Sequence, residues 1–478
     1  MKQIKLDVAV IGAGTAGLGA YRAALKHTDK IAIIEGGPFG TTCARVGCMP
    51  SKLLIAAADA AHGIKKAPGF GIHPQGETRI DGEKVMGRVR SERDRFVGFV
   101  LESIDGIDKA HIIRGYARFV GPLKLQVDEH TLIEAKSVVI ATGSEPMVPP
   151  PFKDLGKKLL LNDDIFEMRD LPKSMAVIGP GIIGLEIGQA LHRLGVRVTI
   201  LGRGGRVGPL SDPEVQDYAT RCFQEELDLD PDAAISLVEK DPDCVTIHFK
   251  GTNGKSRKES FESVLVATGR VPKLKGLMLD QTGVELDRFG VPLFDPYTLQ
   301  CGDSSLFIAG DANNNRPLLH EAADEGKIAG EGAALYPNNL GGQRRTPIGV
   351  MFSQPQVAMI GKSFSELREG EYEIGTVNFE DQGRSRVMLK NKGILRVYGE
   401  KGTGIFLGAE MIGPAAEHIA HLLAWARQQK MTVPRMLEMP FYHPVIEEGV
   451  RTALRDLNSK LHLGPKPISR CIDCGPGA

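Results

Sequence analysis

The sequence predicts an α/β fold, in which two doubly wound, Rossmann-like domains in series are followed by a C-terminal α+β domain. Three observations lead to this fold class. A Gly-x-Gly-x-x-Gly motif follows an apolar strand at Gly12–Gly17, and the same arrangement returns at Gly179–Gly184. From about Thr346 the chain changes to alternating runs such as ILRVYG and GIFLGAEM, which are typical of antiparallel strands.

The first unit begins with LDVAVIG, a Val/Ile-rich run that is typical of a buried parallel strand. The helical stretch TAGLGAYRAALKH follows, and the next strand, KIAIIE, ends in Glu35. In such a unit the glycines allow a tight turn and a close approach of pyrophosphate, while the acid binds a ribose hydroxyl. We therefore predict a dinucleotide site formed by Gly12, Gly14, Gly17 and Glu35. The alternative is a glycine-rich turn without a ligand.

The second unit, SMAVIGPGIIGLEIGQALHRLGVRVTILGR, repeats the strand, turn, helix and strand. Glu35 lies 23 positions after Gly12, but the matching position after Gly179 is Gly202, and Arg203 follows it. A site without the acid and with a cation nearby suits a nucleotide that carries a 2′-phosphate. The predicted residues of this second site are Gly179, Gly181, Gly184 and Arg203. Arg203 could also be an ordinary solvated loop residue.

Two later stretches, SVVIATGSEP and SVLVATGRVP, are apolar strands that end in Ala-Thr-Gly and are expected to close the two domains. They place Thr142 and Gly143 at the first site and Gly269 at the second. A further strand, LFIAG, ends at Asp311, and ligands of such sheets bind at the carboxyl ends of strands. The expected domains are residues 1–147, 148–272, 273–345 and 346–478.

The composition gives no argument for a nucleic-acid or membrane partner, because Lys plus Arg equals Asp plus Glu at 59 each among the 478 residues. The N-terminus resembles neither a signal peptide nor a membrane span, so a cytoplasmic location is expected. Structural disulfides are rare there. Three isolated cysteines, Cys222, Cys244 and Cys301, are therefore interpreted as small buried apolar residues.

The combination of motifs resembles the FAD-dependent pyridine nucleotide–disulfide oxidoreductases over nearly the whole chain. The motifs are the two glycine turns, the run VGCMPSK, the two Ala-Thr-Gly strands, Gly310-Asp311, and His443-Pro444 with Glu448. The resemblance implies an enzyme that uses FAD and NAD(P)(H) and acts as a homodimer on a small dithiol or disulfide. It assigns FAD to residues 1–147 with 273–345, NAD(P) to 148–272, and dimerisation to 346–478.

Within this resemblance, Cys43 and Cys48 form a redox-active disulfide. Four residues separate them, which allows the pair to close with little backbone change. Pro50 suits a first helical turn, so Cys48 is expected near a helix N-terminus, which lowers a thiol pKa. By the family pattern Cys48 faces the flavin and Cys43 exchanges with substrate. The alternatives are a structural disulfide or half of a metal site, and no metal site is predicted.

Four further residues take roles by the same resemblance. Lys52 is expected near the flavin, and its partner is Glu186 on the helix of the second glycine motif. His443, supplied by the other subunit, is expected to be the general base for the exchanging thiols, and Glu448 is expected to orient it. An imidazole with a pKa near 7 suits this task.

The expected substrate is dihydrolipoamide, which makes the activity that of a dihydrolipoyl dehydrogenase. Departures from the family pattern leave an NADPH-dependent disulfide or metal reductase, similar to glutathione or mercuric reductase, as the alternative. These departures are Arg45, Tyr442 and the Gly202–Arg203 pair. A redox sensor that turns over poorly is a more distant alternative. The C-terminal pair Cys471 and Cys474 is interpreted either as an electron or metal shuttle or as an incidental part of a tail.

Overall fold

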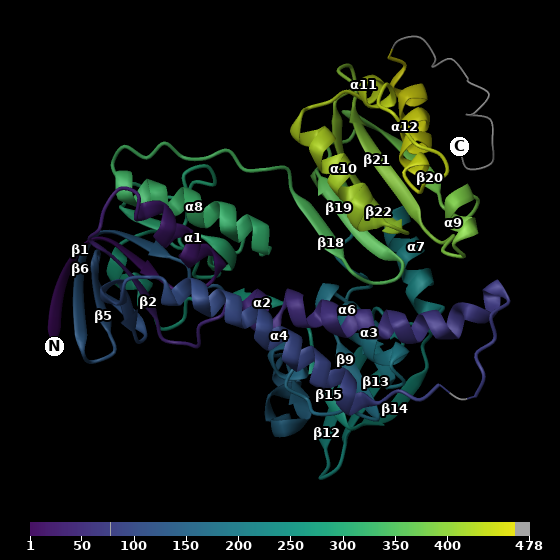
Figure 1. Ribbon diagram of the computed structural model, residues 1–478, viewed down its shortest axis with the longest axis horizontal. Helices are drawn as coiled ribbons and strands as arrows, with labels where there is room; N and C mark the ends of the chain where they lie inside the picture. Colours follow the sequence, from purple (N-terminus) through teal and green to yellow (C-terminus); the bar gives the residue numbers. More distant parts are fainter. Residues whose placement is uncertain (77, 464–478) are drawn as a thin grey trace.

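The computed structural model describes residues 1–76 and 78–463 of the chain and has the predicted fold class (Figure 1). Figure 1 shows the first sheet on the left, the second sheet at the lower right, and an antiparallel sheet at the upper right. The predicted pair Cys471 and Cys474 lies outside the described residues. Among the described residues, no helix combines the length and the apolar character needed to cross a membrane.

The first sheet has the order β3-β2-β1-β6-β5-β4, and β17 pairs with β6. Its strands are β1 Lys2–Ile11, β2 Ile31–Glu35, β3 Ile112–Arg114, β4 Ala117–Gly121, β5 Lys124–Val127, β6 Thr131–Ile140 and β17 Leu306–Ile308. Helices α1 (Thr15–Ala24) and α8 (Leu319–Leu335) pack against each other on this sheet. The segment from β17 to α8 thus returns, late in the chain, to the layers that begin at the N-terminus.

The second sheet has the order β11-β10-β9-β15-β8 and is parallel. Its strands are β8 Leu159–Leu160, β9 Ser174–Ile178, β10 Arg197–Leu201, β11 Asp228–Asp230 and β15 Ser263–Val266. An antiparallel sheet, β12 to β14, is added to this domain, and helices α6 and α7 follow β9 and β10. Their bounds are α6 Ile182–Arg193, α7 Pro213–Gln224, β12 Ala234–Lys240, β13 Val245–Lys250 and β14 Ser256–Phe261.

The third sheet is antiparallel, with the order β18-β19-β22-β21-β20. Its strands are β18 Ile348–Met351, β19 Gln356–Gly361, β20 Tyr372–Asn378, β21 Ile394–Glu400 and β22 Phe406–Gly413. The predicted strands ILRVYG and GIFLGAEM are β21 and β22, so their antiparallel pairing is confirmed. The helices of this domain are α9 Gly383–Val387, α10 Ala416–Gln428, α11 Val433–Leu437 and α12 Glu448–Leu461.

Three helices lead from the first sheet to the other domains: α2 (Thr42–Val46), α3 (Cys48–Lys66) and α4 (Gly82–Asp105). Helix α3 packs against α6 of the second domain. One buried cluster includes Leu54 of α3, Leu185 of α6 and Met351 of the third sheet. Helix α3 therefore shares a hydrophobic core with the second and third domains.

Short elements connect the domains that contain the first and second sheets. Strands β7 (Ser144–Pro146) and β16 (Arg270–Pro272) directly follow the two Ala-Thr-Gly segments and pair with each other, and α5 spans Asn162–Ile165. One expectation about the cysteines is wrong. Cys222 and Cys301 are buried, but Cys244 is half-exposed because it lies in the turn between β12 and β13, close to Asp241.

Candidate active site

The two cysteines of the redox motif lie on consecutive short segments of helix. Cys43 is in α2 and is half-buried, whereas Cys48 is the first residue of α3 and is exposed in the single subunit. Gly47 lies between the two helices with a non-helical backbone (φ −127°, ψ −115°), so α2 ends and α3 begins at this residue. The predicted placement of Cys48 at a helix N-terminus is therefore confirmed.

The two thiols have opposite acid strengths. A hydrogen bond between the two thiol groups lowers the pKa of Cys48 to about 7, and the positive charge of Lys52 acts in the same direction. The same hydrogen bond, together with burial, raises the pKa of Cys43. The N-terminus of the 19-residue helix α3 also favours an anionic sulfur at Cys48. In the reduced pair, these effects favour ionisation of Cys48 over that of Cys43.

Lys52 and Glu186 join α3 to α6, as predicted from the sequence. The Lys52 Nζ atom lies 2.7 Å from Oε2 and 3.0 Å from Oε1 of Glu186, whose side chain is 4% exposed. The backbone N–H of Phe352, which follows β18, donates to Glu186 Oε1 over 2.8 Å. The ion pair one turn from Cys48 is therefore tied to the third domain as well.

His443 and Glu448 form the predicted pair at the other end of the chain. His443 Nδ1 lies 3.0 Å from Glu448 Oε1, and the Val445 N–H donates to the second carboxylate oxygen over 3.2 Å. The Glu448 side chain is buried, but that of His443 is 63% exposed, and the neighbouring Tyr442 is 80% exposed. Among the described residues, no hydrogen bond joins His443 to either redox cysteine of the same subunit.

The first glycine turn leaves room for a phosphate group. A Cβ atom on Gly17 would lie 1.8 Å from the Gly12 carbonyl oxygen, whereas one on Gly14 would meet nothing within 4 Å. Helix α1 begins directly after Gly14 and has no side-chain cap, so its first N–H groups can receive an anion. The Thr142 hydroxyl is buried without a partner. An open cradle and an unpaired hydroxyl fit a bound dinucleotide such as FAD.

Two carboxylates frame this first site. Glu35 accepts from the N–H groups of Ala13 and Gly37, at 2.8 and 2.7 Å. Asp311 lies in a 3₁₀ turn after β17 and accepts from the Ser144 hydroxyl at 2.7 Å. Both acids are therefore held at the carboxyl ends of strands of the first sheet.

The second glycine turn copies the first. A Cβ atom on Gly184 would lie 1.9 Å from the Gly179 carbonyl oxygen, and one on Gly181 would meet nothing within 4 Å. Helix α6 begins after Gly181 and again lacks a side-chain cap. This second cradle therefore fits the pyrophosphate of NAD(P)(H) in the same way.

In the second site, packing leaves no space for a side chain at the position that corresponds to Glu35 of the first site. The Gly12 N–H donates to Ile34 O and the Gly179 N–H to Leu201 O, both at 2.8 Å, so Glu35 and Gly202 occupy equivalent positions. A Cβ atom on Gly202 would lie 2.4 Å from the Pro231 carbonyl oxygen. An acid therefore has no room there without a backbone shift. Arg203 and Arg206 are exposed on the loop that follows.

Sequence reasoning missed a network between the two nucleotide domains. Arg270 donates to Ser144 Oγ and Ser144 O, both at 2.8 Å, and to Asn162 Oδ1 at 3.1 Å. The Asn162 amide donates to Val46 O at 2.9 Å. This network runs from Asp311 through Ser144 to the end of α2. In the sequence, only the arginine that follows the second Ala-Thr-Gly could have pointed to this network. Its partners, Ser144 and Asn162, are more than 100 residues away along the chain.

Arg45, the cation between the redox cysteines, lies in the last turn of α2 and is half-exposed. Its side chain runs past Gly40, where a Cβ atom would lie 2.9 Å from Arg45 Cδ. The electrostatic effect on the Cys48 thiol comes from Lys52 rather than from Arg45. Although Arg45 stands between the two cysteines in the sequence, it is not among the charges that lower the pKa of Cys48.

Comparison with known proteins identifies similarities along most of the chain. Residues 6–326 match the sequence model described as pyridine nucleotide-disulphide oxidoreductase, and residues 348–454 match the dimerisation domain of the same family. A dihydrolipoyl dehydrogenase of Thermus scotoductus is 30% identical over 462 residues, covering 95% of this chain and 98% of that protein. A mercuric reductase of Bacillus cereus is 30% identical over 456 residues, covering 94% of this chain and 71% of that protein.

The fold is also that of a solved structure, LpdA from Mycobacterium tuberculosis. The TM-score is 0.79 at 23% sequence identity, and the match covers 95% of this chain and 99% of that chain. The chain described here and LpdA therefore share the same fold.

Proposed function

The chain belongs to the pyridine nucleotide-disulphide oxidoreductase family and is a FAD-dependent disulfide oxidoreductase, and from this premise we propose that its substrate is dihydrolipoamide. The observation that carries the proposal is the pair of thiols at the start of α3, where Cys48 is acidic and Cys43 is not. Such a pair separates a sulfur that stays anionic from one that exchanges with substrate.

Bound FAD would pass the electron pair between the nicotinamide and the Cys43–Cys48 disulfide. The residues proposed to hold it are Gly12, Gly14, Gly17, Glu35, Thr142, Gly143 and Asp311. Lys52, kept in place by Glu186, is proposed to put a positive charge beside the flavin and Cys48. The residues proposed for NAD(P)(H) are Gly179, Gly181, Gly184, Arg203 and Gly269.

In the proposed exchange, one thiol of dihydrolipoamide gives its proton to His443, and its sulfur bonds to the sulfur of Cys43. The Cys43–Cys48 bond breaks, and Cys48 leaves as a thiolate. The second substrate thiol then loses its proton to solvent, and its sulfur attacks the first substrate sulfur. Cys43 leaves and takes the proton from His443. Lipoamide is released with its disulfide closed, and two electrons remain on the enzyme's thiols.

The dimerisation-domain match supports assembly as a homodimer. We propose that His443 reaches the Cys43 of the other subunit, because its side chain is exposed and, within the described part of the chain, it makes no hydrogen bond to Cys43 or Cys48 of its own subunit. Glu448 holds Nδ1 of this histidine, so Nε2 is left to exchange protons. The cytoplasmic location expected from the sequence stays a prediction.

For the nicotinamide nucleotide we propose that NADP(H) is used at least as well as NAD(H). Two observations support this. The position of the ribose-binding acid is Gly202, where packing leaves no space for a side chain, and Arg203 is exposed on the adjoining loop. An arginine binds a 2′-phosphate by charge and by paired hydrogen bonds.

A metal reductase is the second candidate, favoured by the equal identity of the Bacillus cereus mercuric reductase. Steady-state assays of the holoenzyme with dihydrolipoamide, oxidised glutathione and mercuric ion, each with both nicotinamide nucleotides, separate the candidates. The proposal expects the largest kcat/KM for dihydrolipoamide. Turnover of mercuric ion or glutathione with no turnover of dihydrolipoamide would refute it.

A further inference from the structure

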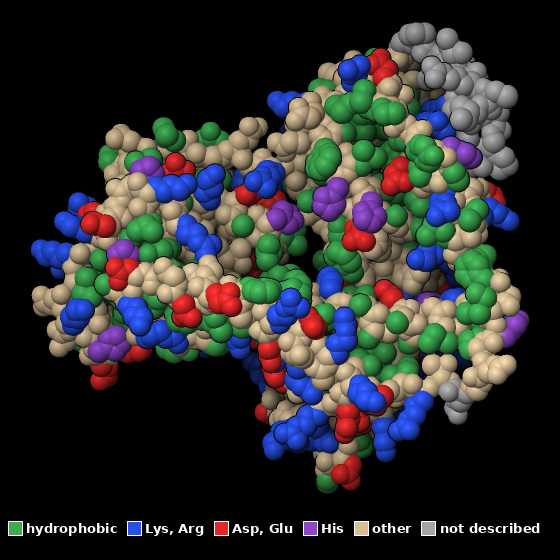
Figure 2. Space-filling model, viewed as in Figure 1, with side chains coloured by type: hydrophobic (Ala, Val, Ile, Leu, Met, Phe, Trp, Pro, Cys, Tyr) green, Lys and Arg blue, Asp and Glu red, His purple; other side chains and the backbone are tan. Residues whose placement is uncertain are grey.

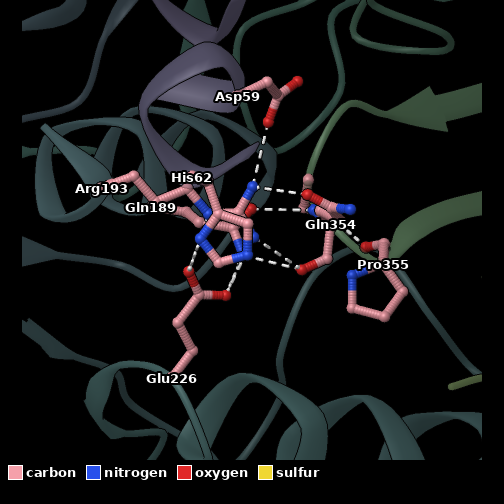
Figure 3. Close-up of polar contacts among 8 residues, drawn as sticks. Asp59, His62, Gln189, Arg193, Glu226, Gln354 and Pro355 are labelled. Carbon is pink, nitrogen blue, oxygen red and sulfur yellow. Dashed lines mark hydrogen bonds and ion pairs between the residues drawn. The ribbon is translucent and has the colours of Figure 1, made fainter. Parts of the chain in front are cut away.

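A buried arginine at the end of α6 connects three separate parts of the chain (Figure 3). The Arg193 side chain is only 4% exposed. All of its N–H groups donate: to Glu226 after α7 at 2.7 and 3.0 Å, to Asp59 of α3 at 3.0 Å, and to Gln354 at 2.8 and 3.4 Å. Only the planar guanidinium supplies five donors in this fork, so a lysine cannot make the same set of bonds.

The same face of α6 binds the backbone of the β18–β19 connection. Glu186 accepts from the Phe352 N–H, and Gln189 both accepts from the Gln354 N–H at 2.8 Å and donates to Gln354 O at 2.9 Å. The side chains of Glu186, Gln189 and Arg193 are spaced by three and four residues, which places them on one face of a helix. This face therefore fixes the path of the third domain's first loop.

The contacts between α3 and α6 come in two matching levels. Lys52 pairs with Glu186, and Asp59 pairs with Arg193, so the second pair lies seven residues further along both helices. Seven residues are about two helical turns, or about 10 Å. Gln189 lies between the levels and also donates to Glu226 at 2.9 Å. The Asp59–Arg193 pair thus helps to keep α3 in register with α6, and this register also places Lys52, Glu186 and Cys48.

These contacts matter for a site shared between subunits. In a two-fold dimer, the position of His443 of the partner subunit relative to Cys43 depends on two links. One is the contact between the two dimerisation domains, and the other is the attachment of each dimerisation domain to its own α3. Arg193, Gln189, Asp59, Glu226 and Gln354, here called the α6 clamp, form part of the second link.

We propose that Arg193 is a positioning residue that sets the distance between Cys43 and His443 of the partner subunit. Its hydrogen-bond partners are Glu226, Asp59 and Gln354, none of which is proposed to bind substrate or cofactor, and it acts through the α6 clamp on the dimerisation domain. The inference rests on the proposed function, in which His443 of the partner subunit is the base for thiol exchange. It predicts that loosening the clamp slows thiol exchange but leaves the electron transfer within one subunit unchanged.

The test is Arg193→Lys in the holoenzyme, which keeps the charge and removes the planar fork. Rapid-mixing reduction by nicotinamide nucleotide is expected to stay within about twofold of wild type, whereas oxidation of dihydrolipoamide is expected to slow by about tenfold or more, because small misplacements of reacting groups are costly. Alkylation of Cys43 by iodoacetamide in the reduced enzyme is an activity-independent readout. Its rate near neutral pH is expected to fall in parallel with the exchange.

Arg93→Lys is the matched control. Arg93 is also a buried, ion-paired arginine, at 10% exposure, but it joins α4 to Glu167 and has no contact with the α6 clamp. It is expected to lower thermal stability and to leave the ratio of the two half-reaction rates unchanged. If Arg193→Lys also leaves that ratio unchanged, the inference is wrong.

A double-mutant cycle separates this inference from the proposed function. In a His443→Gln background, Arg193→Lys is expected to cause no further loss of exchange rate, because the base it positions is gone. Losses that multiply would overturn the inference. If His443→Gln alone leaves exchange intact, the proposed role of His443 fails. If His443→Gln slows exchange and Arg193→Lys does not, only the positioning role fails.

Discussion

At the scale of single residues, the redox pair shows how two identical thiols acquire different chemistry. Cys43 and Cys48 share a hydrogen bond that favours the anion on Cys48, and Cys48 also starts the 19-residue helix α3. Both effects stabilise a negative charge on Cys48. The asymmetry therefore comes from position along the chain, since the two side chains are chemically the same.

This asymmetry predicts opposite spectra for the two serine variants of the holoenzyme. Two-electron reduction of the wild-type protein is expected to give long-wavelength absorbance from an electron-rich Cys48 sulfur beside the flavin. Cys43→Ser is expected to show this band without reduction, because Cys48 is then a free thiolate near neutral pH. Cys48→Ser is expected to lack it under all conditions. Identical spectra from both variants would show that the roles are assigned wrongly.

A second residue-scale prediction concerns His62 beside the α6 clamp. Burial and the positive charge of Arg193 lower the pKa of His62 to about 4. Below its ordinary pKa near 6.5 the unfolded chain gains a proton that the folded protein does not, so stability is lost as the pH falls. From about pH 7.5 to about pH 5 the lost free energy of unfolding is less than about 2 kcal/mol, because solvent screens a group that is only partly buried.

Urea unfolding of wild type and His62→Gln at the two pH values measures this contribution. The variant is expected to lose less stability on acidification than the wild type. His73→Gln, at an exposed histidine, serves as the control and is expected to follow the wild type. An unchanged pH dependence in His62→Gln would contradict the prediction.

At the scale of elements, the two glycine turns are copies with one difference at the end of the second strand. In both, the first glycine lies against the third, and the middle glycine faces open space before a helix without a side-chain cap. The second strand of the first unit ends in Glu35, but that of the second unit is followed by Gly202 beneath Pro231 and Pro180. The same fold thus provides two sites with different ribose environments.

The packing at Gly202 predicts how this element responds to substitution. Gly202→Ala is expected to weaken NADPH binding by about tenfold or more, because the new Cβ must displace the Pro231 backbone and disturb the loop. Arg203→Ala, which removes only the exposed cation, is expected to raise the Kd for NADPH and leave that for NADH unchanged. Fluorescence titration measures both. Equal effects of Arg203→Ala on the two nucleotides would show that Arg203 does not bind the 2′-phosphate.

At the scale of the whole molecule, a hollow lies between the first domain and the dimerisation domain in the view of Figure 2, with histidine side chains beside it. His443 and Tyr442 are exposed in the subunit although the adjoining Glu448 is buried. The helix α10 also exposes Leu422 and Trp425, at 41% and 71%. Exposed apolar side chains of this kind are typical of a surface that a second subunit covers, in agreement with the dimerisation-domain match.

A shared site predicts complementation between inactive subunits. Cys43→Ser and His443→Gln homodimers are each expected to have little activity with dihydrolipoamide. After subunit exchange at equal amounts, about half of the dimers are hybrids with one intact site each, so about a quarter of wild-type activity is expected. Native mass spectrometry verifies the exchange. Verified hybrids without activity would show that Cys43 and His443 do not act together.

The two nucleotide turns, the position of Cys48 near a helix N-terminus and the order of the domains could be predicted from the sequence alone, because these depend on local spacing. The redox role of Cys43 and Cys48 was implied by the family resemblance. A glycine motif between a strand and a helix, or Pro50 two residues after Cys48, constrains the chain within a few positions. The pairs Lys52–Glu186 and His443–Glu448 were found only through the family resemblance.

Only the tertiary structure decided the features that join distant segments. Gly202 looked like a lost acid, but its closed environment comes from Pro231, almost thirty residues later. No sequence pattern singled out Arg193, because its partners lie on α3, after α7 and in the third domain. Such contacts arise when helices and sheets pack, and a buried charge is stable only where packing supplies its partners.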